Sequence, residues 1–230
     1  MNKHQHQHQN QNLDQHQQYY YTTRFSYDPK RTIVWQEICS YLNKHYIATD
    51  SKVLEIGCGY GDFIGNIVAK KKDAIEIEPY FKKFIEKDSQ VKIHVTDASI
   101  ALSEFPENSF DVVFCSNYFE HLEIEPIKDQ LKYISKILTK NGRLIVIQPN
   151  FQLCCKNYFD DYTHKTIFSH TSFSDLLQLH NFSIYKCYKG FIPFSMKSKF
   201  PIIRMFVRFY LKSMIKPAAK QFMIVASVNK

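Results

Sequence analysis

The chain lacks the features that mark membrane-spanning and secreted proteins. None of its apolar stretches approaches the ~18 uncharged residues that a bilayer-crossing helix needs, and no apolar signal core follows the first residues. Its 6 cysteines include no CxxC pair and no metal-ligand spacing. We therefore expect a cytoplasmic protein with reduced, mostly buried thiols, and we predict no metal site.

Acidic residues are missing from the C-terminal part of the chain. Between residues 186 and 230 there are ten Lys or Arg and no Asp or Glu. The formal net charge is +8, so the other 185 residues together carry 8 − 10 = −2. Because the basic charge belongs to one segment, the sequence does not favour a protein that coats nucleic acid uniformly.

The first 18 residues contain almost nothing that could be buried. They are a low-complexity run of Gln, His and Asn, which predicts a disordered tail. His4, His6 and His8 could bind a metal ion adventitiously. The remaining residues, 19–230, are enough for one domain with a full core, and we predict a single domain there.

Strand-like and helix-like segments alternate along this domain. Residues 28–46 have apolar side chains at helical spacing, and short apolar stretches bounded by turn residues indicate strands. Ser172, with Asp175 three residues on, is expected to start a helix that ends near His180. Residues 150–170 break the pattern and predict a loop or cap. We expect strands at residues 52–56, 74–77, 92–95, 110–116, 141–148, 182–189 and 221–228, and helices also at 62–70, 79–87, 126–138 and 201–216. Such alternation predicts a parallel α/β sheet with helices on both faces.

Glycine is scarce, with 6 in the chain, and Gly57, Gly59 and Gly61 fall together in "KVLEIGCGYGDF". The spacing is GxGxG, with Asp62 where a dinucleotide fingerprint has its third glycine. Glu55 before the turn would repel a pyrophosphate and attract an ammonium group. The turn therefore favours a ligand with a positive amino end, a ribose and an adenine, such as S-adenosylmethionine. A nucleotide cofactor and a purely structural turn stay open as alternatives.

Carboxylates follow the next two predicted strands. Glu76 ends the second strand and suits the two hydroxyls of a ribose. Glu78 competes with it, but Glu78 precedes Pro79 and is expected to face solvent or cap a helix. Asp97 follows the third strand and could accept a hydrogen bond from an adenine amino group. The carboxyl ends of parallel strands are where ligands bind in open α/β sheets.

Several motifs resemble class I S-adenosylmethionine-dependent methyltransferases, over about residues 20–228. They are "VLEIGCGYG", "SFDVVFCSNYFEHL" and "NGRLIVIQPNF". One subgroup, found beside bacterial glycan and glycosyltransferase genes, shares segments similar to "DPKRTIVWQEI", "YFDDYTH" and "IPFSMKS". The resemblance implies a Rossmann-like, doubly wound, seven-stranded sheet that is mostly parallel with an antiparallel last strand. The predicted cofactor-binding residues are Glu55, Gly57, Cys58, Gly59, Gly61, Glu76, Asp97, Ala98 and Asn117.

Histidines are the candidates for the chemistry of the acceptor. His121 follows the fourth strand, close to where the methyl group should lie, and His164 lies in the 150–170 cap. Asp160 and Asp161 are near enough in sequence to orient an imidazole. We predict His164, His121 and Asp160 as catalytic residues. The alternatives are that His121 packs beside the cofactor at a helix start, and that His164 stabilises the cap with a hydrogen bond.

The basic segment contains a helix-like stretch at residues 201–216. Arg204, Arg208, Lys212 and Lys216 recur every four residues and form one cationic ridge, while most other positions are apolar. Such a helix either packs on the sheet with one basic edge in solvent, lies at a membrane surface, or forms a dimer contact. We therefore keep a peripheral contact with the inner membrane surface as an alternative to a purely cytoplasmic protein.

The sequence as a whole predicts a methyltransferase that uses S-adenosylmethionine. We expect it to methylate an oxygen or nitrogen of a small molecule or glycan, with a lipid-linked acceptor as one possibility. The alternatives are a protein or RNA methyltransferase, and a cofactor-binding subunit without catalysis. Amino methylation of nucleic acid is not expected, because "SNYF" after the fourth strand lacks the prolines of that chemistry.

Overall fold

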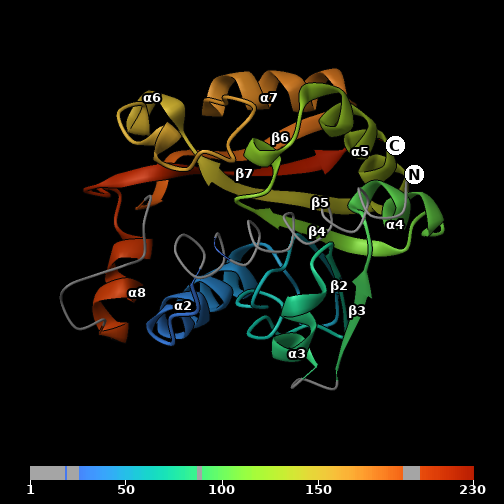
Figure 1. The fold of residues 1–230 in the computed structure, drawn as a ribbon, viewed down its shortest axis with the longest axis horizontal. Helices are drawn as coiled ribbons and strands as arrows, with labels where there is room; N and C mark the ends of the chain where they lie inside the picture. Colours follow the sequence, from blue (N-terminus) through green and yellow to red (C-terminus); the bar gives the residue numbers. More distant parts are fainter. Residues whose placement is uncertain (1–18, 20–25, 87–89, 194–202) are drawn as a thin grey trace, which may run out of the picture.

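The computed structural model describes residues 19, 26–86, 90–193 and 203–230. The tail predicted to be disordered and most of "IPFSMKS" lie outside these ranges. Seven strands form one sheet in the order β3-β2-β1-β4-β5-β7-β6 (Figure 1). The strands are β1 (Lys52–Ile56), β2 (Lys71–Glu76), β3 (Val91–Val95), β4 (Phe110–Ser116), β5 (Leu138–Pro149), β6 (Phe182–Pro193) and β7 (Ala219–Val228).

The strand directions confirm the predicted fold class. β3, β2, β1, β4 and β5 pair in parallel, whereas β7 is antiparallel to both β5 and β6. β2 and β3 extend the sheet on one side of β1, and β4 and β5 extend it on the other. The sheet therefore has a topological switch point between β1 and β4, which is where ligands bind in such sheets.

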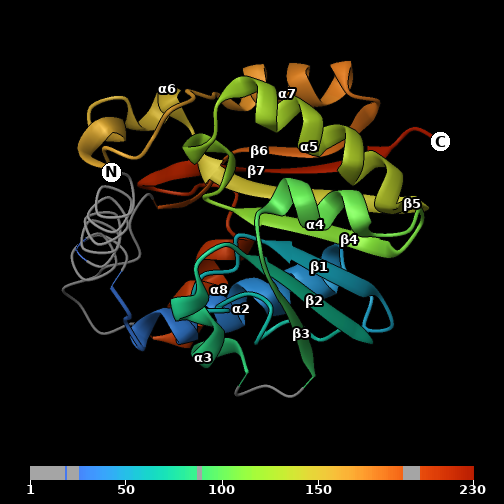
Figure 2. The ribbon, with the colours of Figure 1, turned by 45° about the vertical axis from the view of Figure 1, so that its right-hand side comes forward.

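Helices cover both faces of the sheet (Figures 1 and 2). One face carries α4, α5 and α7, and the other carries α2, α3 and α8, each over its own apolar core. The helices are α2 (Lys30–His45), α3 (Lys82–Ile85), α4 (Ala98–Glu104), α5 (Ile124–Ile137), α6 (Phe151–Cys154), α7 (His170–Leu179) and α8 (Arg204–Lys212), and the short 3-10 turns are η1 (Pro79–Phe81), η2 (Phe119–His121) and η3 (Tyr158–Asp160). Within the described ranges, no helix has both the length and the apolar character to cross a membrane.

Aromatic side chains pack tightly beneath the glycine turn that follows β1. Phe63, just after the turn, stacks on Phe114 of β4 with ring centroids 3.7 Å apart, and Trp35 of α2 meets Phe114 edge-on. All three side chains are buried. The turn that follows β1 is therefore anchored from below by aromatic contacts between α2 and β4.

Two predicted helix starts differ from the structure. Residues 59–66 form turns instead of the start of a helix over 62–70, because Gly61 is left-handed and the Glu55 carboxylate takes the Ile64 N–H. In α7 the N-cap is Ser169, not Ser172. The two serines cap each other reciprocally, since each side chain accepts a hydrogen bond from the other's backbone N–H, at 2.9 and 3.1 Å.

The basic ridge of α8 turns toward α2. Arg208 forms a two-pronged pair with Glu37, with Nε–Oε2 and Nη2–Oε1 distances of 2.9 and 3.0 Å, and Arg204 donates to Gln36. Besides the exposed cations Arg204, Arg208 and Lys212, α8 and its flanks leave six large apolar side chains exposed: Ile203, Met205, Phe206, Phe209, Met214 and Ile215. The helix thus presents an apolar face outward, which the spacing of its cations alone did not indicate.

The Arg208–Glu37 pair predicts a pH-dependent contribution to stability. The hydrogen bonds from Arg208 lower the pKa of the Glu37 carboxyl from its usual value. As the pH falls, the unfolded chain therefore takes up the Glu37 proton before the folded protein does, and the contribution of the pair is lost as the pH falls through the lowered pKa. Arg208→Gln should lower the melting temperature by a few degrees at pH 7, and the difference should be smaller at pH 3.

The exposed Lys212 on the same helix supplies the control. Among the described residues it forms no ion pair, so Lys212→Gln should change the melting temperature little at either pH. An Arg208→Gln effect of the same size at pH 3 and pH 7 would contradict the role given to Glu37.

Candidate cofactor and acceptor site

The glycine turn follows β1 at the switch point. Gly57, Gly59 and Gly61 have φ values of 69°, 51° and 74°, in the left-handed region that favours glycine. The backbone N–H of Gly57 donates to the Ile75 carbonyl over 2.9 Å, which bends the turn across the end of β2. A Cβ built on Gly57 would lie 2.6 Å from Cδ2 of Tyr118, so there is no room for a side chain. The ring of Tyr118 therefore occupies the space that a side chain at residue 57 would need.

Glu76 is held rigidly at the carboxyl end of β2. Its Oε2 accepts a hydrogen bond from Gly59 N at 2.7 Å, and its Oε1 accepts one from Glu78 N at 3.0 Å. Burial raises the pKa of this carboxyl above its usual value. Each oxygen keeps a further lone pair for the hydroxyls of a ribose. Glu78 instead caps η1 through Tyr80 N, as the sequence predicted.

Glu55 lies deeper than the ligand-facing position that the sequence suggested. Its side chain is almost fully buried, and Oε2 accepts a hydrogen bond from Ile64 N at 3.0 Å. Burial holds the pKa of the carboxyl well above its usual value. The observed contact ties the segment after the turn to the strand before it. Attraction of a cofactor ammonium by Glu55 stays a prediction.

The other predicted cofactor residues lie at the same edge of the sheet. Asp97 is exposed after β3 and caps α4, with Oδ1 accepting from Ser99 N at 2.7 Å, and the buried Ala98 starts that helix. Asn117 is exposed and left-handed directly after β4. Cys58 is buried within the turn. The carboxyl ends of β1 to β4 therefore bring these residues to one side, although their contacts with a cofactor stay predictions.

The two predicted histidines meet just past the carboxyl end of β4, near Tyr118, whose ring lies against Gly57. Their ring centroids are 5.0 Å apart, although they come from η2 and from the 158–166 loop. Nδ1 of His164 lies 2.7 Å from the Tyr158 carbonyl oxygen, and Nδ1 of His121 lies 2.9 Å from Thr163 Oγ1. The hydrogen bond of His164 is the cap-stabilising contact that was the alternative to a catalytic role, but it engages one ring nitrogen only.

The carboxylate that supports His121 is Asp161, not Asp160. Thr163 Oγ1 donates to Asp161 Oδ1 over 2.6 Å and can therefore accept from Nδ1 of His121. Asp160 is exposed, and its Oδ2 accepts from Asn157 Nδ2 at 3.0 Å. The orienting role predicted for Asp160 is corrected accordingly, since a position one residue later turns its side chain toward the imidazole.

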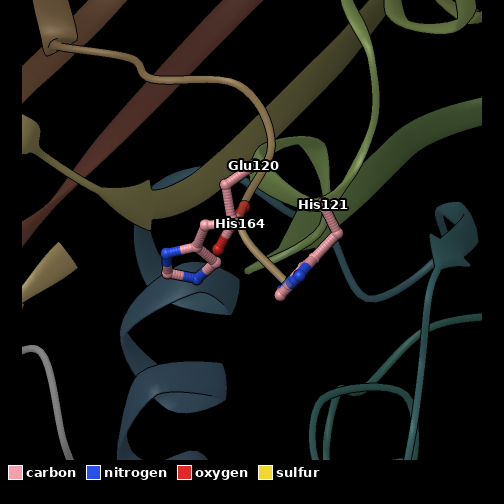
Figure 3. A group of neighbouring side chains, drawn as sticks. All are labelled: Glu120, His121 and His164. Carbon is pink, nitrogen blue, oxygen red and sulfur yellow. The ribbon is translucent and has the colours of Figure 1, made fainter. Parts of the chain in front are cut away.

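Glu120 is the site residue that sequence reasoning missed. It is 1% exposed, and within the described part of the chain neither of its carboxylate oxygens has a hydrogen-bond partner. Figure 3 shows the carboxylate close to both imidazoles, and one ligand-type atom from each of the three residues lies within 4.8 Å of the others. In the sequence, only its position next to His121 in "FEHL" could have indicated that Glu120 belongs to the site. The sequence does not show, however, that His164 completes the group.

Burial sets the protonation of this group. It raises the pKa of Glu120 to about 8. It also lowers the pKa of His121 to about 4, with a further contribution from His164, whose own pKa burial lowers as well. Both imidazoles are therefore neutral near pH 7, which is the form that accepts a proton or binds a metal ion.

Comparisons with known proteins agree with this geometry. Residues 54–146 match the family described as a methyltransferase domain. The chain is 29% identical over 211 residues to an uncharacterized protein of Methanocaldococcus jannaschii, covering 86% of this chain and 87% of the relative. It is 29% identical over 144 residues to an uncharacterized methyltransferase of Alkaliphilus oremlandii, covering 60% and 66%. A SAM-dependent methyltransferase structure from Archaeoglobus fulgidus has a TM-score of 0.62 at 19% identity, covering 84% and 94%.

The matched region runs from β1 to β5 and contains the glycine turn and Glu76. The chain therefore carries a methyltransferase domain. The sheet has the fold of S-adenosylmethionine-dependent methyltransferases, and the domain match supports methyl transfer with S-adenosylmethionine as the cofactor, as the sequence predicted. Contacts of the glycine turn with the methionine part and of Glu76 with the ribose hydroxyls stay predictions.

Proposed function

We propose that this methyltransferase acts on an oxygen or nitrogen of a small molecule or glycan, and that the acceptor is carried on a lipid. The observation that carries the proposal is the pair of neutral imidazoles, His121 and His164, next to the glycine turn. S-adenosylmethionine supplies an already activated methyl group when bound. The protein's own task is then to position an acceptor atom and accept the proton that it loses.

Hydroxyl and ammonium groups must lose a proton when they are methylated, so acceptors of these kinds need a base. A neutral imidazole within reach of an acceptor hydroxyl can accept its proton as the new bond forms. The loop that carries His164 is tied to η2, because Lys165 N and Thr166 N donate to the Glu120 carbonyl at 2.8 and 3.2 Å. The two histidines are thereby held in edge-to-face contact, with their ring centroids 5.0 Å apart.

The exposed apolar face of α8 supports a lipid-linked acceptor. Phe206 and Phe209 are 61% and 66% exposed, and apolar side chains flank them on the same helix. α8 packs on α2, and Arg31 of α2 pairs with Asp62 after the glycine turn at 2.8 Å. A membrane that meets α8 would therefore be one helix away from the cofactor turn. An amphipathic helix with such a face can lie in the lipid headgroup region.

The test is methyl transfer from labelled S-adenosylmethionine to four acceptors: soluble glycans, lipid-linked glycans in phospholipid vesicles, protein and RNA. We expect label on the glycans and none on protein or RNA. The double variant Phe206→Ser/Phe209→Ser should slow transfer to the lipid-linked acceptor at least about tenfold, since each buried phenyl group contributes about 1.5–3 kcal/mol. Transfer to the soluble glycan should stay unchanged.

The control is Leu179→Ser, which removes an equally exposed apolar side chain at the end of α7, on the other face of the sheet. It should slow neither reaction. Label on protein or RNA would instead favour that class of methyltransferase. Binding of S-adenosylhomocysteine without turnover on any acceptor, together with a stable protein partner, would favour a cofactor-binding subunit.

A further inference from the structure

The three side chains beside the glycine turn form an arrangement that proton transfer alone does not explain. Two imidazoles and one carboxylate come from η2 and the 158–166 loop, and their ligand-type atoms lie within 4.8 Å of one another (Figure 3). We propose that Glu120, His121 and His164 bind a divalent first-row transition metal ion, with Zn²⁺ as the type case, and that this ion holds the oxygen of the acceptor.

The first support is the unpartnered carboxylate of Glu120. Buried polar groups in native proteins nearly always have a hydrogen-bond partner, and one that has none calls for a missing water or ion. Glu120 has none for either oxygen among the described residues, and its side chain is 1% exposed. One ligand-type atom of Glu120 lies within 4.8 Å of one from each imidazole (Figure 3). A metal ion bound between the three groups would give the carboxylate oxygens the partner that they lack.

The second support is how the two imidazoles are oriented. The Tyr158 carbonyl can only accept, so Nδ1 of His164 carries the hydrogen of that 2.7 Å contact. Thr163 gives its own hydrogen to Asp161, so Nδ1 of His121 carries the hydrogen of the 2.9 Å contact with Thr163. Each ring therefore keeps a lone pair on Nε2. Metal-binding histidines typically have their other nitrogen fixed in this way by a carbonyl or a carboxylate.

The ligand types decide which metal fits. Two imidazoles with one carboxylate are typical of Zn²⁺, Co²⁺ and Fe²⁺, whereas Mg²⁺ and Ca²⁺ prefer oxygen ligands throughout. Ligands at about 2.0–2.2 Å from a tetrahedral Zn²⁺ are about 3.4 Å apart, so the three atoms would need to close by at most about 1.4 Å. Side-chain rotation can provide such a closure. Three protein ligands leave at least one position open for an acceptor oxygen.

The proposed role in methyl transfer rests on the function proposed above, whereas the metal site itself does not. An oxygen bound to the ion loses its proton more easily, as a metal-bound water does. With the ion bound, both Nε2 atoms are metal ligands, so the acceptor O–H bond breaks with its proton passing to water and not to an imidazole. The new oxygen–carbon bond forms as the sulfur–carbon bond breaks, and the sulfur keeps the electron pair. The charge of the metal ion does not change, so no oxidant or reductant is needed.

The test is titration of the chelator-treated full chain with Co²⁺, followed by visible absorption. Every sample carries glutamine at His4, His6, His8 and His16, so that the N-terminal histidines bind no metal. We expect one Co²⁺ per chain with the absorption bands of a four- or five-coordinate site, and Zn²⁺ should displace it. Glu120→Gln and His164→Gln should each weaken Co²⁺ binding at least about 100-fold, more than loss of a supporting residue does.

The control variant is His45→Gln, which removes an exposed histidine on α2 and should leave Co²⁺ binding unchanged. Binding of S-adenosylhomocysteine and the melting temperature, measured on the same samples, show that each variant is folded. No binding of Co²⁺ by the chain, or equal binding by the His164→Gln variant, would overturn the site. Equal methyl transfer by metal-free and Zn²⁺-loaded protein would overturn the role of the ion. Because Co²⁺ binding needs no acceptor, the site can stand even if the proposed function fails.

Discussion

Glu76→Gln should weaken the binding of S-adenosylhomocysteine at least about 100-fold, because two hydrogen bonds to a charged group are worth about 1.5–3 kcal/mol each. The carboxylate is fixed by Gly59 N and Glu78 N, so its remaining lone pairs point in a set direction at the end of β2. An amide at this position loses the charge. The NH2 group of the amide would also face a backbone N–H, that of Gly59 or of Glu78, so two donors would meet there. Calorimetric titration measures the change.

Two neighbouring variants make this result specific. Glu76→Asp keeps the charge with a shorter reach and should retain most of the affinity. Glu78→Gln keeps an acceptor for Tyr80 N and should bind S-adenosylhomocysteine as the wild type does. If Glu78→Gln lost affinity and Glu76→Gln did not, the ribose would have to be assigned to Glu78. The melting temperatures of all three variants show whether the fold is intact.

Much of the sheet could be predicted because its central strands are buried on both faces. β4 has the predicted bounds, since "FDVVFCS" is apolar except for Asp111 and the final Ser116 and lies between turn residues. α4 was not predicted, because "ASIALSE" is only seven residues long and too short to show a helical period. The helix expected over 62–70 failed for a different reason. Its apolar spacing was real, but the Glu55 carboxylate and the left-handed Gly61 hold that segment in turns.

The cofactor side of the site could be predicted from the order of strands along the sequence, whereas the acceptor side could not. The glycines follow β1, Glu76 ends β2 and Asp97 lies just past β3, so parallel pairing alone gathers them at one edge. His164 reaches His121 only through the folding of the 158–166 loop onto η2. That contact depends on the hydrogen bonds from Lys165 and Thr166 to Glu120, which no local pattern indicates. The unpartnered state of Glu120 is likewise a property of packing.

Gly57→Ala should abolish detectable binding of S-adenosylhomocysteine while leaving the protein folded. Alanine in the left-handed region costs about 1–2 kcal/mol, and its Cβ would lie 2.6 Å from Cδ2 of Tyr118. That ring cannot easily move aside, because its hydroxyl donates to Gln130 Oε1 at 3.0 Å and Gln130 in turn donates to Ser99. The backbone of the turn must therefore shift, and with it the surface on which the ligand lies.

A double-mutant cycle separates the two causes. Tyr118→Ala opens the space beside residue 57, so the melting temperature of the Gly57→Ala/Tyr118→Ala variant should exceed the value expected from adding the two single effects. The loss of melting temperature that remains in the double variant measures the cost of alanine in the left-handed backbone at residue 57. Gly190→Ala in β6 is the matched control, since Gly190 is not among the positive-φ glycines and its Cβ would meet a single methyl group at 3.0 Å. It should bind S-adenosylhomocysteine normally. Wild-type affinity in Gly57→Ala would mean that this backbone does not contact the cofactor.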